Sequence, residues 1–222
     1  MWRDALLVGG KDLRIEFGSR VALNQIAPFA LSVLVLFGFA LGPDPKTLAG
    51  AEAGLFWLAV LFSTTLAVQR SFAIEAADDA ADGLRLSGLD PAGVFLGKAG
   101  AIALQLCLLE VLLSVVAALL FSLPLTSGGV LVVSALAATA GLAALGALYG
   151  ALSASARVRE TLLPLLFLPA AAPVLLGATT AWKHALAHQP GQSLGWIGLV
   201  AAFALVYTAL GVVVFGPMLE DR

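Results

Sequence analysis

The sequence predicts an all-α integral membrane protein with six transmembrane helices, an N-terminal interfacial helix and a cytoplasmic coupling helix between spans 2 and 3. Hydrophobic residues make up 60% of the 222 residues, charged residues only 12%, and the mean hydropathy is +1.00. A soluble domain of this length has too little interior to bury so much apolar surface. A helix needs about 20 apolar residues to cross a bilayer core, and six stretches of the chain approach that length.

The segment 1–20 is predicted to lie along the membrane surface. Seven charged residues are interspersed there with apolar ones such as Trp2, Leu6 and Phe17, a pattern typical of an amphipathic interfacial helix. Gly9 and Gly10 are the weak point of this helix, because adjacent glycines favour a break.

The six spans are predicted to form a single transmembrane domain over residues 1–222. They are expected at residues 21–42, 53–69, 93–123, 128–153, 161–182 and 194–217. The second span is the shortest and must extend into its flanks to cross the bilayer. Asp90 followed by Pro91 is typical of an N-cap and a first helical residue, so the third helix is expected to begin there.

Spans 4 and 5 carry two further patterns. Gly146 and Gly150 have the GxxxG spacing that permits two helices to approach closely. Pro164, Pro169 and Pro173 each remove a backbone donor, which predicts a kinked fifth span. Two interpretations of the kink stand: a helix that moves during gating, or a helix with a fixed bend.

Lysine and arginine, which are enriched in cytoplasmic loops, set the predicted orientation. Of the 12 such residues, all but Lys46 and Lys183 lie on one side of the predicted membrane, so both termini are expected in the cytoplasm. Trp57, Trp182 and Trp196 fall at the predicted outer ends of their spans, where indole rings commonly anchor a helix at the interface.

The predicted coupling segment, residues 70–91, contains the acidic sequence EAADDAAD. On a helix its four carboxylates, those of Glu75, Asp78, Asp79 and Asp82, fall within an arc of roughly 100°. Alanines occupy the opposite side. This acidic stripe is either a solvated face or a docking surface for a cytoplasmic partner with a partly basic cleft.

Glu110 is the one strongly unexpected residue inside a span. A charge near the middle of the bilayer costs from about 2.5 to more than 10 kcal/mol. The side chain must therefore face other helices, a cavity or a partner, or be protonated. Ser114 lies one turn further on the same face. The pair either lines a transport path or locks a conformation, or it only fixes helix packing through a hydrogen bond.

The sequence offers few residues for phosphate-binding, metal-binding or catalytic sites. The segment GVFLGKAG departs from the phosphate-binding loop in spacing and lacks its final Ser or Thr, so Lys98 is expected to snorkel toward the interface. His184 and His188 lie in the predicted outer loop, either as a ligand pair or as solvated side chains. We expect no catalytic, metal-binding or cofactor-binding residues, no enzymatic activity, and no nucleic-acid partner at a net charge of −2.

Several stretches together resemble the CcmB family, the haem-exporter permeases of bacterial cytochrome c maturation. KDLRIEFGSR resembles the N-terminal segment of that family, and RSFAIE with GLRLSGLDPAGVFLGKA resembles the loop between its second and third spans. ARVRETLLPLLFLPAAAPVLL is similar to its fifth span, and LFSTTLAVQRSF and LLEVLL agree as well. The resemblance runs through nearly the whole chain.

This resemblance implies a permease subunit of an ABC complex of the type-2 exporter kind in the bacterial inner membrane. It implies a separate ATPase, CcmA, the membrane partners CcmC and CcmD, the haem chaperone CcmE, and a homodimer of the permease within the complex. ATP would bind to the partner, and haem would be the transported or handled ligand. The residues expected to dock the ATPase are Phe72, Glu75, Asp78, Asp79, Asp82, Leu84, Arg157, Arg159 and Glu160.

Two rival classes stand beside this interpretation. A stand-alone secondary transporter would use Glu110 as an ion or proton site and would need no cytoplasmic partner. An assembly scaffold would bind the ATPase but move nothing. Co-purification of an ATPase subunit separates the first rival from the permease.

Overall fold

The computed structural model describes residues 1–20, 22–41, 45–77, 88–121, 127–154 and 159–220, and within these residues every regular element is helical. The chain begins with α1 (Trp2–Ser19), a short π-helical segment (Ala22–Ile26) and α2 (Ala27–Ala40). Long helices follow: α3 (Pro45–Ala77), α5 (Pro91–Phe121), α6 (Gly128–Ala154), α7 (Arg159–Leu186) and α8 (Pro190–Glu220). The all-α class is therefore confirmed for the described part of the chain.

Five of these helices have stretches long and apolar enough to cross a membrane: Gly50–Ala73, Pro91–Phe121, Gly128–Leu152, Pro164–Leu186 and Pro190–Met218. The predicted first span is different, because α2 is short and reaches span length only together with the π-helical segment before it. A sixth span is counted only if α1 and the helix after it, which are bent by 56°, are taken as one broken unit.

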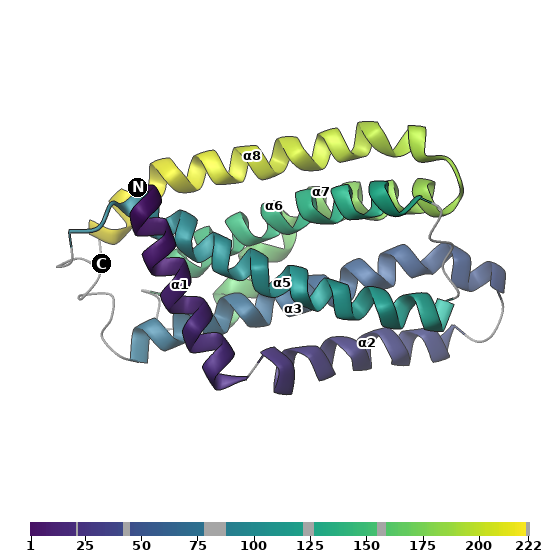
Figure 1. Ribbon diagram of the computed structural model, residues 1–222, viewed down its shortest axis with the longest axis horizontal. Coiled ribbons are helices and arrows are strands. Elements are labelled where there is room, and N and C mark those ends of the chain that lie inside the picture. The colour runs from purple at the N-terminus through teal and green to yellow at the C-terminus, as the bar shows by residue number, and fades with distance from the viewer. Residues whose placement is uncertain (21, 42–44, 78–87, 122–126, 155–158, 221–222) are drawn as a thin grey trace.

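The long helices run side by side, and both termini lie at one end of the bundle (Figure 1). We call this end the terminal end and the opposite one the distal end. The C-terminal ends of α2, α5 and α7 and the N-terminal ends of α3, α6 and α8 lie at the distal end.

Small residues let the helices approach closely in the bundle core. A Cβ atom on Gly146 would lie 2.5 Å from the Val68 side chain, and one on Gly150 would overlap the Phe72 ring. The predicted GxxxG contact is thereby confirmed, and it joins α6 to α3. At a second close contact, between α5 and α8, the Phe95 ring lies over Gly211 and packs beside Phe215.

The helices extend beyond several of the predicted spans. The second span is the clearest case, because α3 extends beyond 53–69 at both ends, as the short apolar stretch requires. Residues 70–77 continue this helix and do not form a separate one, while 78–87 lie outside the described residues. The start of α5 is confirmed: Pro91 is its first residue, and Asp90 accepts a hydrogen bond from the Ala92 N–H at 3.0 Å.

Candidate functional site

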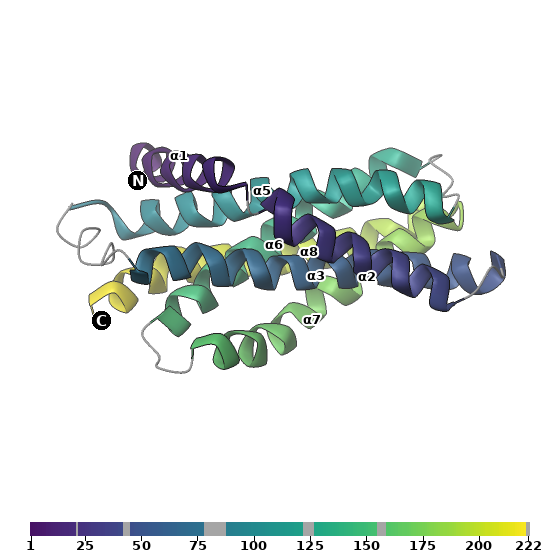
Figure 2. The same cartoon turned by 90° about the horizontal axis from the view of Figure 1, so that it is seen from below.

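Helix α1 lies against the first half of α5 at the terminal end of the bundle (Figure 2). Glycines make this contact close. A Cβ on Gly97 of α5 would lie 2.6 Å from the Ala5 carbonyl oxygen, and one on Gly9 of α1 would lie 3.0 Å from the Gly97 carbonyl oxygen. Gly93, four residues before Gly97, meets the carbonyl of Met1 in the same way. The segment GVFLG is thus a small-residue packing motif.

The continuity of α1 follows from this packing. The helix runs from Trp2 to Ser19 without a break, so the weak point expected at Gly9 and Gly10 is absent. Gly9 is buried at the contact, and Gly10 faces away from it, since a Cβ there would meet nothing within 4 Å. Tertiary contact therefore outweighs the low helix propensity of the glycine pair.

An ion pair fixes α1 to α5 one turn beyond the glycines. The Lys98 ammonium lies 3.2 Å from a carboxylate oxygen of Asp12 and 4.7 Å from the centre of the Phe72 ring. Lys98 is only 1% exposed, so the expectation that it snorkels was wrong. A buried ammonium needs a carboxylate and gains further from an aromatic face, and α1 and α3 supply these two groups.

Two more polar contacts connect α1 to both ends of the predicted coupling segment. The buried carboxylate of Glu16 accepts a hydrogen bond from Nε of Arg70 at 3.2 Å. Asp4 accepts one from the backbone N–H of Asp90, also at 3.2 Å, and this bond lowers the pKa of the Asp4 carboxyl. Arg70 is the first residue of segment 70–91 and Asp90 is the last but one. Helix α1 therefore contacts both ends of this segment.

The residues predicted to dock an ATPase lie around this region as far as the structure describes them. Phe72 is 1% exposed, because Lys98 of α5 and Gly150 of α6 cover its ring. The ring therefore packs α3 against these two helices. Glu75 belongs to the last turn of α3, and Arg159 and Glu160 begin α7. Asp78, Asp79, Asp82, Leu84 and Arg157 lie outside the described residues. Docking by any of these residues stays a prediction.

Inside the membrane region, Glu110 is 5% exposed and bonded to a neighbouring helix. Thr139 of α6 donates a hydrogen bond to its Oε1 at 2.6 Å. The predicted interhelical contact is therefore present. A cavity of about 350 Å³ adjoins it, lined by Cys107, Glu110 and Ser114 of α5, by residues of α6 and by Trp182 of α7. Exposed side chains such as Val111 and Val132 also line this space, so it is a groove open at the outer face of α5 and α6, and the glutamate has both a packing partner and access to that groove.

An aromatic cluster near the distal end corrects the interpretation of two tryptophans. Trp57 and Trp182 are 1% and 4% exposed, with ring centres 5.6 Å apart, and Phe56 stacks on Trp182 at 4.3 Å. They are core residues and not interfacial anchors. Trp196, at 38% exposure, keeps an environment that agrees with anchoring.

The three prolines of the predicted kinked span all lie inside α7, which remains one helix from Arg159 to Leu186. His184 is therefore helical, and His188 follows with a left-handed φ of 59°. Tyr207 of α8 donates a hydrogen bond to the Ala170 carbonyl at 2.7 Å, in the turn between Pro169 and Pro173. A neighbouring helix thus supports the backbone where proline disturbs it.

The glycine contact gives a direct test of α1 docking. Gly9→Leu should destabilise the purified protein by about 1–3 kcal/mol, because the new side chain must displace the α5 backbone. For a chain of this size that corresponds to a melting temperature lower by roughly 2–12 °C. Gly10→Leu is the matched control and should leave the melting temperature unchanged or raise it slightly, because leucine is the better helix former. Equal effects of the two substitutions would show that α1 does not pack through Gly9.

Comparison with known proteins shows which protein family this chain resembles. The family model described as CcmB protein matches residues 3–220. Heme exporter protein B of Haemophilus influenzae is 33% identical over 203 residues, which cover 91% of this chain and 92% of the relative. The protein of the same name from Pseudomonas aeruginosa is 31% identical over 207 residues, covering 93% of each chain. That from Paracoccus denitrificans is 32% identical over 202 residues, covering 90% and 92%.

Proposed function

The chain belongs to the CcmB family, and on this premise we propose that it is the permease subunit of an ABC transporter complex for cytochrome c maturation. It couples ATP hydrolysis by a separate subunit to the export of haem or to the release of a haem-loaded chaperone. The name of its relatives, heme exporter protein B, supports haem as the handled ligand. The chain acts as a single transmembrane permease domain.

The main support for this proposal is the contact of α1 with both ends of segment 70–91. A coupling element transmits force only if its ends are fixed to the helices that must move. Arg70 is tied to Glu16, and the Asp90 N–H to Asp4, while Asp12 and Lys98 join α1 to α5 between them. A push on the segment therefore reaches α3, α1 and α5 together.

The proposed orientation places the terminal end in the cytoplasm of the bacterial inner membrane. Arg3, Lys11, Arg14, Arg70 and Lys98 belong to the parts of α1, α3 and α5 near that end, as the enrichment of cytoplasmic loops in basic residues requires. CcmA then docks on segment 70–91 and on the link between α6 and α7. CcmC and CcmD join in the membrane.

We also propose two copies of the permease in each complex. One chain supplies one coupling segment, whereas a paired ATPase presents two equivalent clefts, which a two-fold dimer of permeases fills. Glu110, with Ser114, lines the groove between α5 and α6, where it would serve as a polar lining for transport or as a conformational lock.

A stand-alone secondary transporter is the second candidate, and the cavity beside Glu110 favours it. In that case Glu110 would be the ion or proton site. Such a transporter needs no ATPase, and so the two functions make different predictions about the purified complex.

Affinity purification of the full chain from its bacterial host tests the proposal. We expect a nucleotide-binding subunit to co-purify, and cells that lack the chain to lose covalently attached haem from their c-type cytochromes. Two results together would establish the secondary transporter instead: the chain purifies without an ATPase, and deletion of the chain still abolishes cytochrome c maturation.

A further inference from the structure

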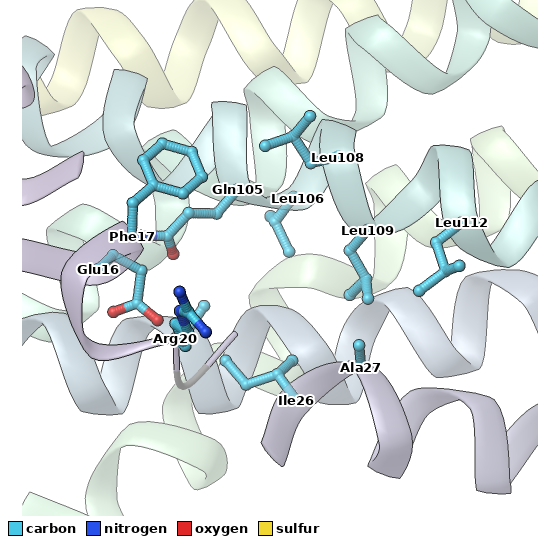
Figure 3. Close-up of a pocket in the computed structure, with 11 residues that line it drawn as sticks. Glu16, Phe17, Arg20, Ile26, Ala27, Gln105, Leu106, Leu108, Leu109 and Leu112 are labelled. Carbon is cyan, nitrogen blue, oxygen red and sulfur yellow. The ribbon is translucent and has the colours of Figure 1, made fainter. Parts of the chain in front are cut away.

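Two grooves open on different sides of α5, and they differ in chemistry. The α5–α6 groove is the one that adjoins Glu110, and the α2–α5 groove, of about 360 Å³, shares no residue with it (Figure 3). In the α2–α5 groove the polar residues Glu16, Arg20 and Gln105 gather where α1 ends, and leucines up to Leu112 line the part along α5. Acyl chains of the bilayer can fill that apolar part without leaving a polar group unsatisfied.

The α5–α6 groove, in contrast, brings together three polar side chains whose hydrogen-bonding capacity is incompletely used within the described residues. Glu110 accepts its bond from Thr139 at Oε1, which leaves Oε2 without a hydrogen-bond donor. Trp182 is 4% exposed, and its indole N–H has no acceptor. The third side chain is that of Ser114.

The hydroxyl of Ser114 departs from the pattern of the other hydroxyls in these helices. Six of them donate to the carbonyl four residues earlier, namely those of Ser32, Ser63, Thr64, Thr65, Thr180 and Thr208. Ser114 has no such bond, nor any other to a described residue. Its hydroxyl is therefore available as a donor in the groove, one helical turn from Glu110.

A bilayer does not satisfy such groups. Hydrocarbon offers no hydrogen-bond partner, and an intramembrane glutamate almost always faces other helices or a water-filled cavity and pairs with a polar group. Here the glutamate adjoins a groove whose rim includes the exposed side chains of Val111 and Val132. The occupant of this groove must therefore supply hydrogen-bonding groups as well as apolar surface.

The shape of this face suits a second copy of the same chain. Val111 and Val115 of α5, at 66% and 56% exposure, form a ridge along the groove. Gly128 and Ala135 are small residues on its α6 side. Ridges of one helix pack into the grooves of another, and a ridge beside a groove on one face lets two copies dock by a two-fold rotation.

The polar groups have the same self-complementarity. In a two-fold contact, if residue i of one copy meets residue j of the other, then j of the first also meets i of the second. Glu110 offers an acceptor and Ser114 offers a donor, one turn apart on α5. Two copies can therefore form two such bonds at once, whereas an unrelated helix would need matching groups of its own at this spacing.

We propose that the α5–α6 groove is the contact between the two copies of the permease, with the Ser114 hydroxyl of each copy donating to Oε2 of Glu110 in the other. This inference rests on the two copies proposed above and names the surface by which they meet. The valine ridge of each copy fills the groove of the other and excludes lipid from the glutamate.

Disulfide cross-linking in membranes that contain the assembled complex tests this contact. Cys107, the only cysteine of the chain, is first replaced by serine, and Val111→Cys and Leu112→Cys are then compared. Leu112 is the matched control, because it is turned by about 100° from Val111 into the α2–α5 groove. A disulfide needs Cα atoms within roughly 7 Å, so oxidation should join Val111→Cys chains into a dimer and leave Leu112→Cys chains monomeric.

Energy transfer between labelled copies of the full chain measures how tightly they associate. One interhelical hydrogen bond inside a membrane corresponds to roughly a three-fold change in a dissociation constant. Ser114→Ala removes two such bonds and should raise the dissociation constant about eight-fold. It should have no further effect in chains that already carry Glu110→Leu. Ser32→Ala on α2, whose hydroxyl bonds within its own helix, is the control and should match wild type.

Co-expressed copies with two different affinity tags separate this inference from the proposed function. If both tags co-purify with the complex but Val111→Cys gives no dimer, or Leu112→Cys gives as much, the two copies stand and the α5–α6 contact is wrong. Recovery of one tag alone would contradict the two copies and this contact with them. A benzophenone attached at position 111 in the Val111→Cys variant reports any other neighbour, and cross-linking to a different subunit would overturn the proposal.

Discussion

Glu110→Leu is expected to abolish cytochrome c maturation while leaving the protein as stable as wild type or slightly more stable. An interhelical hydrogen bond inside a membrane contributes only about 0.6 kcal/mol on average and about 1.7 at most. Leucine also removes the cost of keeping a polar group in an apolar region. If the bond to Thr139 served packing alone, its loss would therefore have little consequence for function.

The measurement pairs covalent haem staining of c-type cytochromes with thermal unfolding of the purified chain. Leu104→Ala, a lipid-facing change on the same helix, is the control and should mature cytochromes normally. Glu110→Gln should retain most of the function if the wild-type side chain is protonated. Normal maturation in Glu110→Leu would exclude both the transport path and the conformational lock.

Reversing the acidic stripe is expected to release the ATPase. The triple variant Asp78→Lys, Asp79→Lys and Asp82→Lys changes the local charge by six units outside every predicted span. Lysine is a good helix former, and added positive charge reinforces the proposed cytoplasmic placement. The variant should therefore reach the membrane at the normal level and fail to retain CcmA in a pull-down.

Salt and partial neutralisation provide the controls. Surface charges act over about 8 Å at physiological ionic strength, so any residual binding should disappear as salt is added. Replacement of the same three residues by asparagine should give intermediate retention. If the lysine variant retains the ATPase like wild type at every salt concentration, the stripe is a solvated face, and docking must come from Arg157, Arg159 and Glu160.

The features that could be predicted from the sequence are those that local chemistry determines. Asp90 and Pro91 start α5 because a side-chain cap and a fixed φ suffice to begin a helix. Gly146 and Gly150 mark a close helix contact because the absence of side chains is itself the signal. The all-helical class followed from the length of the apolar stretches alone.

The features that could not be predicted depend on which helices become neighbours. Lys98, Trp57 and Trp182 were expected at the membrane surface, since each residue type prefers an interface in isolation. Asp12 and the aromatic cluster keep them inside. Helices that are apolar on all sides give no periodic signal that identifies a partner.

The role of α1 was hidden for the same reason. Its pattern predicts a helix on the membrane surface, whereas Gly9, Asp12 and Glu16 attach it to the bundle. The spacing of Gly93 and Gly97 is the signal in the sequence for this close contact. The extension of α3 beyond its apolar stretch has the same origin, because Arg70 finds its partner on α1.

The central claim is that this chain transmits ATP hydrolysis by a partner into movement of its own helices. The most direct test is the ATPase rate of the complete complex in lipid nanodiscs, measured with wild-type chain, with the triple lysine variant and without the chain. We predict an ATPase rate that depends on the wild-type chain and falls to the level of the isolated ATPase in the other two samples. The same rate in all three would contradict the claim.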